Sequence, residues 1–317
     1  AVNFSSEATK LLIYLPGGRA CFDAFSCSTN REAYTEQDFI ESGDGLKALF
    51  TRRAFPNNQD NLFKDWHHIF VAYGSGDVYT GDNSQTDVPN GGPANQIFKG
   101  FNNFRVMLEE YISFIQAQGV QLTDVFLAGS SAGGYGVLGN FDQMANIISA
   151  AFPEVQMTLL NDAGYLLIDE QVVPNCLNQA WESLFNIQIP TDLSNYVSTS
   201  YPTNFLAIYE YLSNKYPDAN FGFFGSYSDL TSRTLLSLGA DNCAYEVGLL
   251  GEQRFRSAIL EQKELLDKFN NWKVYFRNST QHTILPAPEY FTLSINETTF
   301  VDWIEDLNNG MAINVIP

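Results

Sequence analysis

Residues Leu127 to Gly134 read LAGSSAGG, and this stretch decides the fold. It contains the pattern G-x-S-x-G, with Ser131 at its centre. A serine hydroxyl becomes a good nucleophile only when the fold holds it clear of the backbone and beside a base. A sharp turn between a strand and a helix does this, and glycines on both sides let the chain pass close to its neighbours. The stretch therefore predicts a nucleophile turn, with an ordinary glycine-rich turn as the alternative.

The sequence on either side of this turn fits that prediction. Residues 123–128 form a short apolar run, as expected of a buried strand, and residues 135–151 place apolar side chains at helical spacing. Strands and helices alternate elsewhere too, which favours an α/β fold with a mostly parallel sheet flanked by helices. Further strands are predicted at 8–15, 68–73, 155–160, 221–226 and 272–276, and further helices at 97–118, 252–269 and 299–308.

The length and the absence of repeats indicate one domain. The 317 residues are sufficient for a large core, and no long linker divides them, so we expect a single domain over 1–317. Residues 170–220 lack strand periodicity and are rich in Asn, Tyr, Phe and Pro, which predicts a helical, lid-like insertion over the sheet. No apolar run approaches the ~18 residues of a membrane-spanning helix. We expect a monomer.

The chain is strongly acidic, with 17 Lys and Arg against 36 Asp and Glu and a formal net charge of −19. Nucleic acid and anionic membranes require a cationic surface and are not expected as partners. Long-range repulsion also disfavours polyanionic substrates, although Arg52, Arg53 and Lys99 could contribute to a local cationic groove. The cysteines and histidines form no metal-binding pattern, so we expect neither a metal nor an organic cofactor.

Four cysteines bear on the compartment. Cys21 and Cys27 flank a short loop, whereas Cys176 and Cys243 each follow an Asn in a polar segment. We expect two disulfides, Cys21–Cys27 and Cys176–Cys243, which would suit an oxidising compartment. Four buried free thiols are the alternative.

A serine nucleophile needs a general base, and the chain has only three histidines. When such a turn starts a helix of an α/β sheet, the catalytic residues follow in the order Ser, Asp or Glu, His. Only His282 obeys this order. His67 and His68 precede the turn, and as neighbours on a strand they would face opposite sides, so we interpret them as structural.

The third member of such a site must orient the imidazole and stabilise its cation. Asp229 follows the strand 221–226, one strand before that of His282, and is the preferred candidate. Asp162 also follows a strand and is the rival, and Asp241 is a weaker one. For Asp229 and Asp162, the structural alternative is a helix N-cap.

The oxyanion of the reaction needs backbone N–H donors. One donor is expected from Ala132, directly after the nucleophile. The others should come from an early loop after a strand, and residues 16–20 have the glycines that such a turn requires. Gly18 and Arg19 are therefore the candidate donors, with a plain tight turn as the alternative.

With these residues in place, the chain resembles the pectin acetylesterase/Notum family of serine esterases. The resembling blocks are residues 15–27, 73–82, 98–100, 127–142 and 161–164. The resemblance implies an α/β-hydrolase-like fold, a secreted protein and a disulfide between Cys21 and Cys27. It also implies a triad, which falls on Ser131, Asp229 and His282, and an oxyanion hole, which falls on Gly18, Arg19 and Ala132.

Three positions depart from the family pattern. Arg19 stands where the family has Trp, Gly74 where it has Cys, and Thr283 follows the histidine. We therefore expect a carboxylic-ester hydrolase that works through an acyl-enzyme on a neutral acylated or polymeric ester. The alternatives are a pectin or polysaccharide O-acetylesterase and an aliphatic polyester depolymerase. A non-catalytic binding module would have lost one of the three triad residues, and none is lost.

Overall fold

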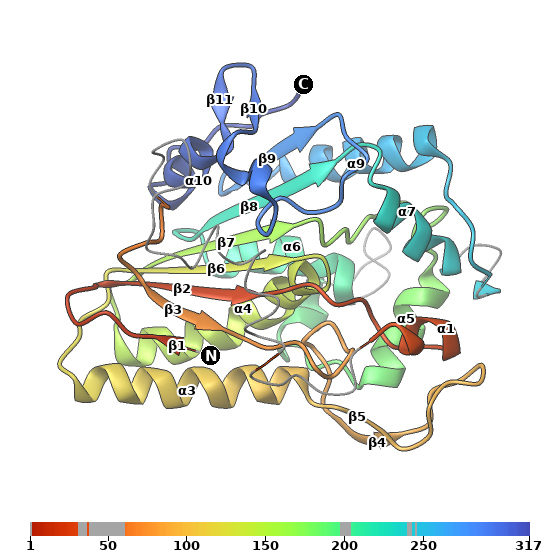
Figure 1. Ribbon diagram of the computed structural model, residues 1–317, viewed down its shortest axis with the longest axis horizontal. Coiled ribbons are helices and arrows are strands. Elements are labelled where there is room, and N and C mark those ends of the chain that lie inside the picture. The colour runs from red at the N-terminus through yellow and green to blue at the C-terminus, as the bar shows by residue number, and fades with distance from the viewer. Residues whose placement is uncertain (1, 31–36, 38–60, 197–203, 240–242, 245) are drawn as a thin grey trace.

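The computed structural model describes residues 2–30, 37, 61–196, 204–239, 243–244 and 246–317 (Figure 1). Within these ranges a seven-stranded sheet has the order β1–β3–β2–β6–β7–β8–β9. Neighbouring strands are parallel except for β1, which pairs antiparallel with β3. The strands are β1 (Val2–Asn3), β2 (Lys10–Leu15), β3 (His67–Phe70), β6 (Asp124–Ser130), β7 (Gln156–Asp162), β8 (Asn220–Ser226) and β9 (Trp272–Arg277).

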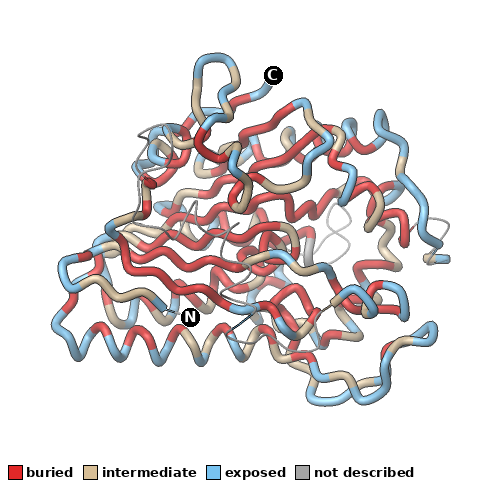
Figure 2. The backbone as a smooth tube through the Cα atoms, in the orientation of Figure 1, coloured by how far each residue is buried: buried red, intermediate tan, exposed pale blue. Residues whose placement is uncertain are grey.

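The central strands are buried along nearly their whole length, as Figure 2 shows. Alternate residues point to opposite faces of a strand, so Leu127 and Phe126 of β6 belong to two different core clusters. A parallel sheet with both faces covered requires such continuous apolar strands. One cluster includes side chains of α3 (Gly100–Ala117), α4 (Ala132–Ala151), α6 (Asn204–Lys215) and α9 (Glu252–Leu266), and the other those of η3 (Pro288–Phe291) and α10 (Phe300–Asn308).

The carboxyl ends of the strands carry the loops that matter for function. The chain runs from β2 to β3 on one side and from β6 to β7 on the other, which leaves a crevice between the ends of β2 and β6. Three helices gather at this edge of the sheet in Figure 1. They are α1 (Ala24–Ser28), α5 (Asn175–Phe185) and α7 (Leu230–Leu236).

The sequence-based prediction was wrong at the start of the long helix. Residues Gln96–Phe98 form β5, which pairs with β4 (Asn83–Thr86), and α3 begins only at Gly100. The Asp77 carboxylate accepts a hydrogen bond from the Gly100 N–H at 2.7 Å. A Cβ on Gly100 would lie 2.3 Å from that carboxylate, so the close approach needs glycine and fixes where the helix begins. Short elements that the sequence did not predict include the hairpin of β10 (Ser294–Ile295) and β11 (Thr298–Thr299).

The described part of the segment 170–220 contains α5, η1 (Leu193–Tyr196) and α6, and no strand precedes Asn220 in it. Only α5 lies at the edge where α1 and α7 gather, whereas α6 packs against α4. The Asp142 carboxylate of α4 accepts hydrogen bonds from Tyr211 and Tyr216, and it forms an ion pair with Lys215 at 2.7 Å. This cluster fixes the second half of the segment to the body of the fold.

Both expected disulfides are present. The first joins Cys21, just before α1, to Cys27 within α1. The second joins Cys176 of α5 to Cys243, in the segment that follows η2 (Ser237–Gly239). The second bond closes a sequence separation of 67 residues. Within the described ranges, none of the helices combines the length and the apolar character needed to cross a bilayer.

Candidate active site

Ser131 lies at the junction of β6 and α4 in a strained backbone conformation. Its φ of 56° and ψ of −118° are rare for a residue with a side chain. The Ser131 N–H donates to the Asp162 carbonyl at 2.8 Å, and the Ser131 carbonyl accepts from Gly134 N–H at 2.8 Å. Bonds on both sides of the residue therefore hold the turn that presents the hydroxyl.

The glycines of this turn are required by close backbone contacts. A Cβ on Gly133 would lie 1.8 Å from the carbonyl oxygen of Leu15 on β2. A Cβ on Gly129 would lie 2.1 Å from the carbonyl oxygen of Gly133. The G-x-S-x-G pattern thus lets the start of α4 pass directly over the end of β2.

His282 follows β9 and pairs with Asp229, which follows β8. The His282 Nδ1 lies 2.6 Å from Asp229 Oδ2, and the aspartate is fully buried. The other carboxylate oxygen accepts from the Ser232 N–H at 2.9 Å, so Asp229 also caps α7. The helix cap and the pairing with histidine, which the sequence left as alternatives, coexist in one residue.

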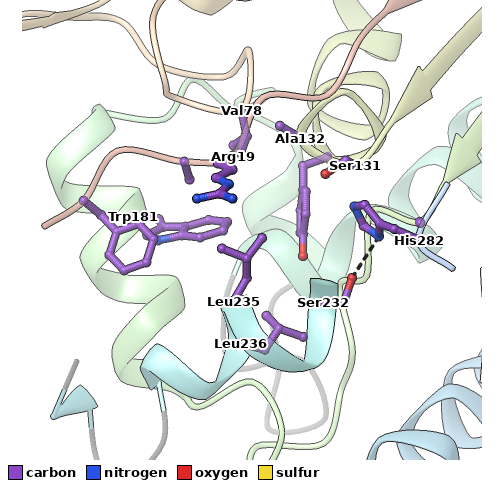
Figure 3. Close-up of a pocket in the computed structure, with 13 residues that line it drawn as sticks. Arg19, Val78, Ser131, Ala132, Trp181, Ser232, Leu235, Leu236 and His282 are labelled. Atoms are coloured by element: carbon purple, nitrogen blue, oxygen red, sulfur yellow. Dashed lines mark hydrogen bonds between the residues drawn. The ribbon is translucent and has the colours of Figure 1, made fainter. Parts of the chain in front are cut away.

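The second nitrogen of His282 faces the pocket. With Nδ1–H donated to Asp229, Nε2 is the acceptor nitrogen, and it has no hydrogen-bond partner in the described part of the chain. Figure 3 shows the imidazole turned toward Ser131, with Ser232 on its far side. The arrangement leaves Nε2 free to receive a proton from a group held at Ser131.

Asp162, the rival acid, has other partners. Its carboxylate accepts from the Ser130 hydroxyl at 2.7 Å and from the backbone N–H groups of Ile284 and Leu285 at 3.0–3.1 Å. Burial raises the pKa of Asp162 to about 6, and these hydrogen bonds limit the rise. Asp241 lies outside the described residues.

The loop after β2 is held by two tyrosines that the sequence analysis did not single out. Tyr73 donates its hydroxyl to the Arg19 carbonyl, and Tyr79 donates to the Pro16 carbonyl at 2.8 Å. Arg19 has a left-handed φ of 69°. Both tyrosines fall in the block 73–82, one of the blocks that carry the family resemblance, but the resemblance assigned no role to either residue.

Three backbone N–H groups at this loop and at the start of α4 have no acceptor among the described residues. They belong to Gly18, Arg19 and Ala132, the three candidate oxyanion donors. Arg19 and Ala132 line the same cavity as Ser131 and His282, and Gly18 lines the adjoining one. The structure therefore brings all six predicted site residues to one edge of the sheet, with Asp229 behind His282.

Two cavities meet at Ser131 and His282. The smaller one has a volume of about 30 Å³, and apolar side chains enclose it away from the serine. Figure 3 shows Trp181, Leu235 and Leu236 on that side. The larger cavity, about 450 Å³, is more open, and its lining combines Thr, Asn and Ser side chains with glycines, prolines and a few aromatic rings.

The remaining candidates lie elsewhere. His67 and His68 are buried residues of β3: His67 Nε2 donates to the Ala8 carbonyl at 3.0 Å, and His68 Nε2 donates to the Phe63 carbonyl at 2.6 Å. Lys99 forms an ion pair with Asp82 at 2.6 Å, and the pair 52–53 is not among the described residues. The described part of the chain contains no cluster of three or more His, Cys, Asp or Glu side chains able to hold a metal ion.

Comparisons with known proteins identify the family of the chain. Residues 2–208 match the model of a family described as pectinacetylesterase. The mouse palmitoleoyl-protein carboxylesterase Notum is 28% identical over 173 residues, which cover 53% of this chain and 32% of the mouse protein. The Drosophila melanogaster Notum carboxylesterase is 26% identical over 211 residues, covering 62% and 29% of the two chains. The matched part thus spans about a third of the length of these relatives.

A solved structure of the Wnt deacylase Notum from Drosophila superposes with a TM-score of 0.66. The superposition covers 99% of this chain and 89% of the other, at 18% sequence identity. At that identity the likeness concerns the fold, and it confirms an α/β-hydrolase-like fold with a mostly parallel central sheet.

Proposed function

The chain belongs to the pectinacetylesterase family, and on this premise we propose that it is a serine hydrolase of carboxylic esters. One observation carries the proposal. His282 is paired with a buried Asp229 through Nδ1, while its Nε2 faces Ser131 without a partner among the described residues. A strained serine, an oriented imidazole and a buried carboxylate are the parts that acyl transfer through serine requires.

The reaction follows from these positions. Ser131 Oγ forms a bond to the acyl carbon and gives its proton to His282 Nε2, while Asp229 stabilises the imidazolium. The carbonyl oxygen takes up negative charge and is bound by the N–H groups of Gly18, Arg19 and Ala132. The ester C–O bond then breaks, and the leaving alkoxide takes the proton from His282. Water next attacks the acyl-enzyme, losing a proton to His282, and the acid leaves as Ser131 regains its own proton.

The two cavities suggest how an ester would lie. The small apolar cavity has room for only a small group, since its volume of about 30 Å³ is a small fraction of that of the larger cavity. We assign it to the acyl group, which favours short acyl chains. The larger cavity then receives the alcohol part. Among its described lining residues only Arg19 has a permanent charge, so this part of the lining has no cluster of cations of the kind that would bind a polyanion.

A polysaccharide O-acetylesterase is the second candidate, and the lining of the larger cavity favours it. Thr29, Asn30, Thr231 and Thr283 supply hydroxyl and amide groups beside the rings of Phe70 and Tyr73. Such a mixture suits a polyhydroxylated alcohol as well as a small neutral one. The two candidates share the triad and differ only in the alcohol. No observation of comparable weight favours an aliphatic polyester.

The setting in which the enzyme works belongs to the same proposal. Two disulfides are typical of a protein that folds in an oxidising compartment, so we propose that it acts outside the cell. We further propose that residues 1–317 act as one monomeric domain, with α5 as the part of the 170–220 segment that borders the site.

Labelling and substitution of the serine test the proposal. A fluorophosphonate probe should form an adduct that mass spectrometry maps to Ser131, and Ser131→Ala should lower kcat on p-nitrophenyl acetate by about 10⁴-fold or more. The control is Ser113→Ala on the exposed face of α3, which should keep full activity. An adduct on Ser130, whose hydroxyl is bonded to Asp162, would contradict this assignment of the nucleophile.

A further inference from the structure

We infer that Asp162 is a positioning residue that connects the nucleophile turn to the loop of His282 and holds both in one geometry. The inference rests on the proposed serine-esterase function and adds to it a second buried carboxylate with its own role. Asp162 is the last residue of β7, between the strands that precede Ser131 and Asp229, and it is fully buried.

The contacts of Asp162 reach both sides of the site. Its carbonyl accepts the Ser131 N–H at 2.8 Å, and its carboxylate accepts the hydroxyl of Ser130, the residue just before the nucleophile. The same carboxylate accepts the N–H groups of Ile284 and Leu285, two and three residues after His282. One side chain therefore fixes the spacing between the two loops that must exchange a proton.

Negative charge on Asp162 serves this purpose better than a neutral side chain would. Hydrogen bonds to an ionised acceptor are shorter and stronger than neutral ones, so the carboxylate holds the two loops more firmly. The charge also interacts favourably with protonated His282, the species formed during acyl transfer. The other titratable or charged groups around it are Tyr14 on β2, Tyr165 after β7 and Arg277 on β9.

This charge lowers stability at neutral pH. Burial raises the pKa of Asp162 to about 6, above its value of 3.8 in an unfolded chain. A group with a raised folded-state pKa contributes stability that is complete below about pH 4 and is lost as the pH rises through about 6. At pH 7 the protein thus keeps an ionised carboxylate that the fold would prefer to protonate, which is expected of a residue retained for function.

The test compares Asp162→Asn with the wild type in the full-length chain. An asparagine oxygen can still accept from Ser130, Ile284 and Leu285, but without charge. We expect kcat on p-nitrophenyl acetate to fall about 10-fold, KM to change less than 2-fold, and Tm at pH 7 to be unchanged or higher. The acid limb of the profile of kcat/KM against pH should become shallower and move to lower pH.

A control is Asp142→Asn, which also removes a buried, multiply hydrogen-bonded carboxylate, here with four donors, but lies away from the site. It should lower Tm and leave kcat unchanged. A second variant, Ser130→Ala, keeps the carboxylate but removes one donor, so the acid limb should move to higher pH even if Asp162→Asn fails to fold.

Wild-type kcat and an unchanged acid limb in Asp162→Asn would overturn the inference, as would an unmoved acid limb in Ser130→Ala. Neither result would affect the assignment of Ser131, because the wild type would still turn over esters and react with the fluorophosphonate. If instead the wild type shows no esterase activity, the proposed function itself fails.

Discussion

Asp229 and Asp162 are both fully buried aspartates near the carboxyl ends of neighbouring strands, but their carboxylate oxygens accept hydrogen bonds from different donors. Asp229 receives the imidazole N–H of His282 and the N-terminus of α7, whereas Asp162 receives a hydroxyl and two backbone N–H groups. The sequence identified His282 because chain order left no other histidine. The sequence could only rank the two aspartates, since both follow a strand. The choice between them depends on which aspartate the imidazole of His282, in the loop after β9, approaches.

Substitutions at His282 and Asp229 should show the triad at the level of single residues. His282→Ala removes the proton acceptor, and Asp229→Asn removes the charge that stabilises the imidazolium, so each should lower kcat by about 10⁴-fold with little change in KM. His67→Ala, a substitution of a buried residue of β3, is the control and should retain kcat per folded molecule. The kcat and KM of each variant are measured by steady-state kinetics on p-nitrophenyl acetate. A triad would be ruled out if Asp229→Asn retained wild-type kcat.

At the scale of elements, apolar spacing predicted most of the strands and helices but not the contacts between them. The strand predicted at 221–226 is β8, which begins one residue earlier at Asn220, and it was predictable because parallel strands buried on both faces read as continuous apolar runs. The start of α3 was missed because it depends on Asp77, which lies 23 residues earlier in the chain. The helix α5 was expected only as part of an insertion, and nothing in its own sequence indicated that it lines the small cavity beside Ser131.

The position of α5 leads to a prediction about acyl length. Trp181 on α5 packs on Phe22 and Tyr135 at ring-centre distances of 5.5 and 5.7 Å and lines the small cavity. Trp181→Leu should enlarge this cavity, so kcat/KM for p-nitrophenyl butyrate and hexanoate should rise relative to acetate, which we expect the wild type to prefer. Trp66→Leu is the matched control, because Trp66 is equally buried, 7% against 8% exposed, and packs in the other core cluster.

Both tryptophan variants are expected to lose stability, by roughly 3 kcal/mol in the range known for large-to-small core substitutions, so chain-length preference is compared as a ratio within each protein. A ratio that stays at the wild-type value in Trp181→Leu would show that acyl groups do not enter the small cavity. The larger cavity would then be the acyl site, and the assignment of the two ester halves would be reversed.

At the scale of the whole molecule, the fold and the net charge of the chain give different information about the substrate. The fold and the family were predictable from the nucleophile turn and the dispersed blocks, because these residues are fixed by close backbone contacts such as that of Gly133 with Leu15. The alcohol part of the substrate was not predictable. In our proposal it depends on the larger cavity, whose lining comes from segments far apart in the chain, from Tyr14 to Pro286.

The net charge of −19 predicts how salt affects a polyanionic substrate. Acetylated polygalacturonate should be repelled at low ionic strength, so acetate release from pectin should be far slower than from p-nitrophenyl acetate. It should rise when salt is added, because the screening length falls to about 10 Å at 0.1 M. An acetylated neutral glycan is the control and should show no such rise. Acetate release from pectin that matches the best small ester and declines with salt would contradict the prediction, since that sign would mean that a local cationic groove steers the polyanion to Ser131.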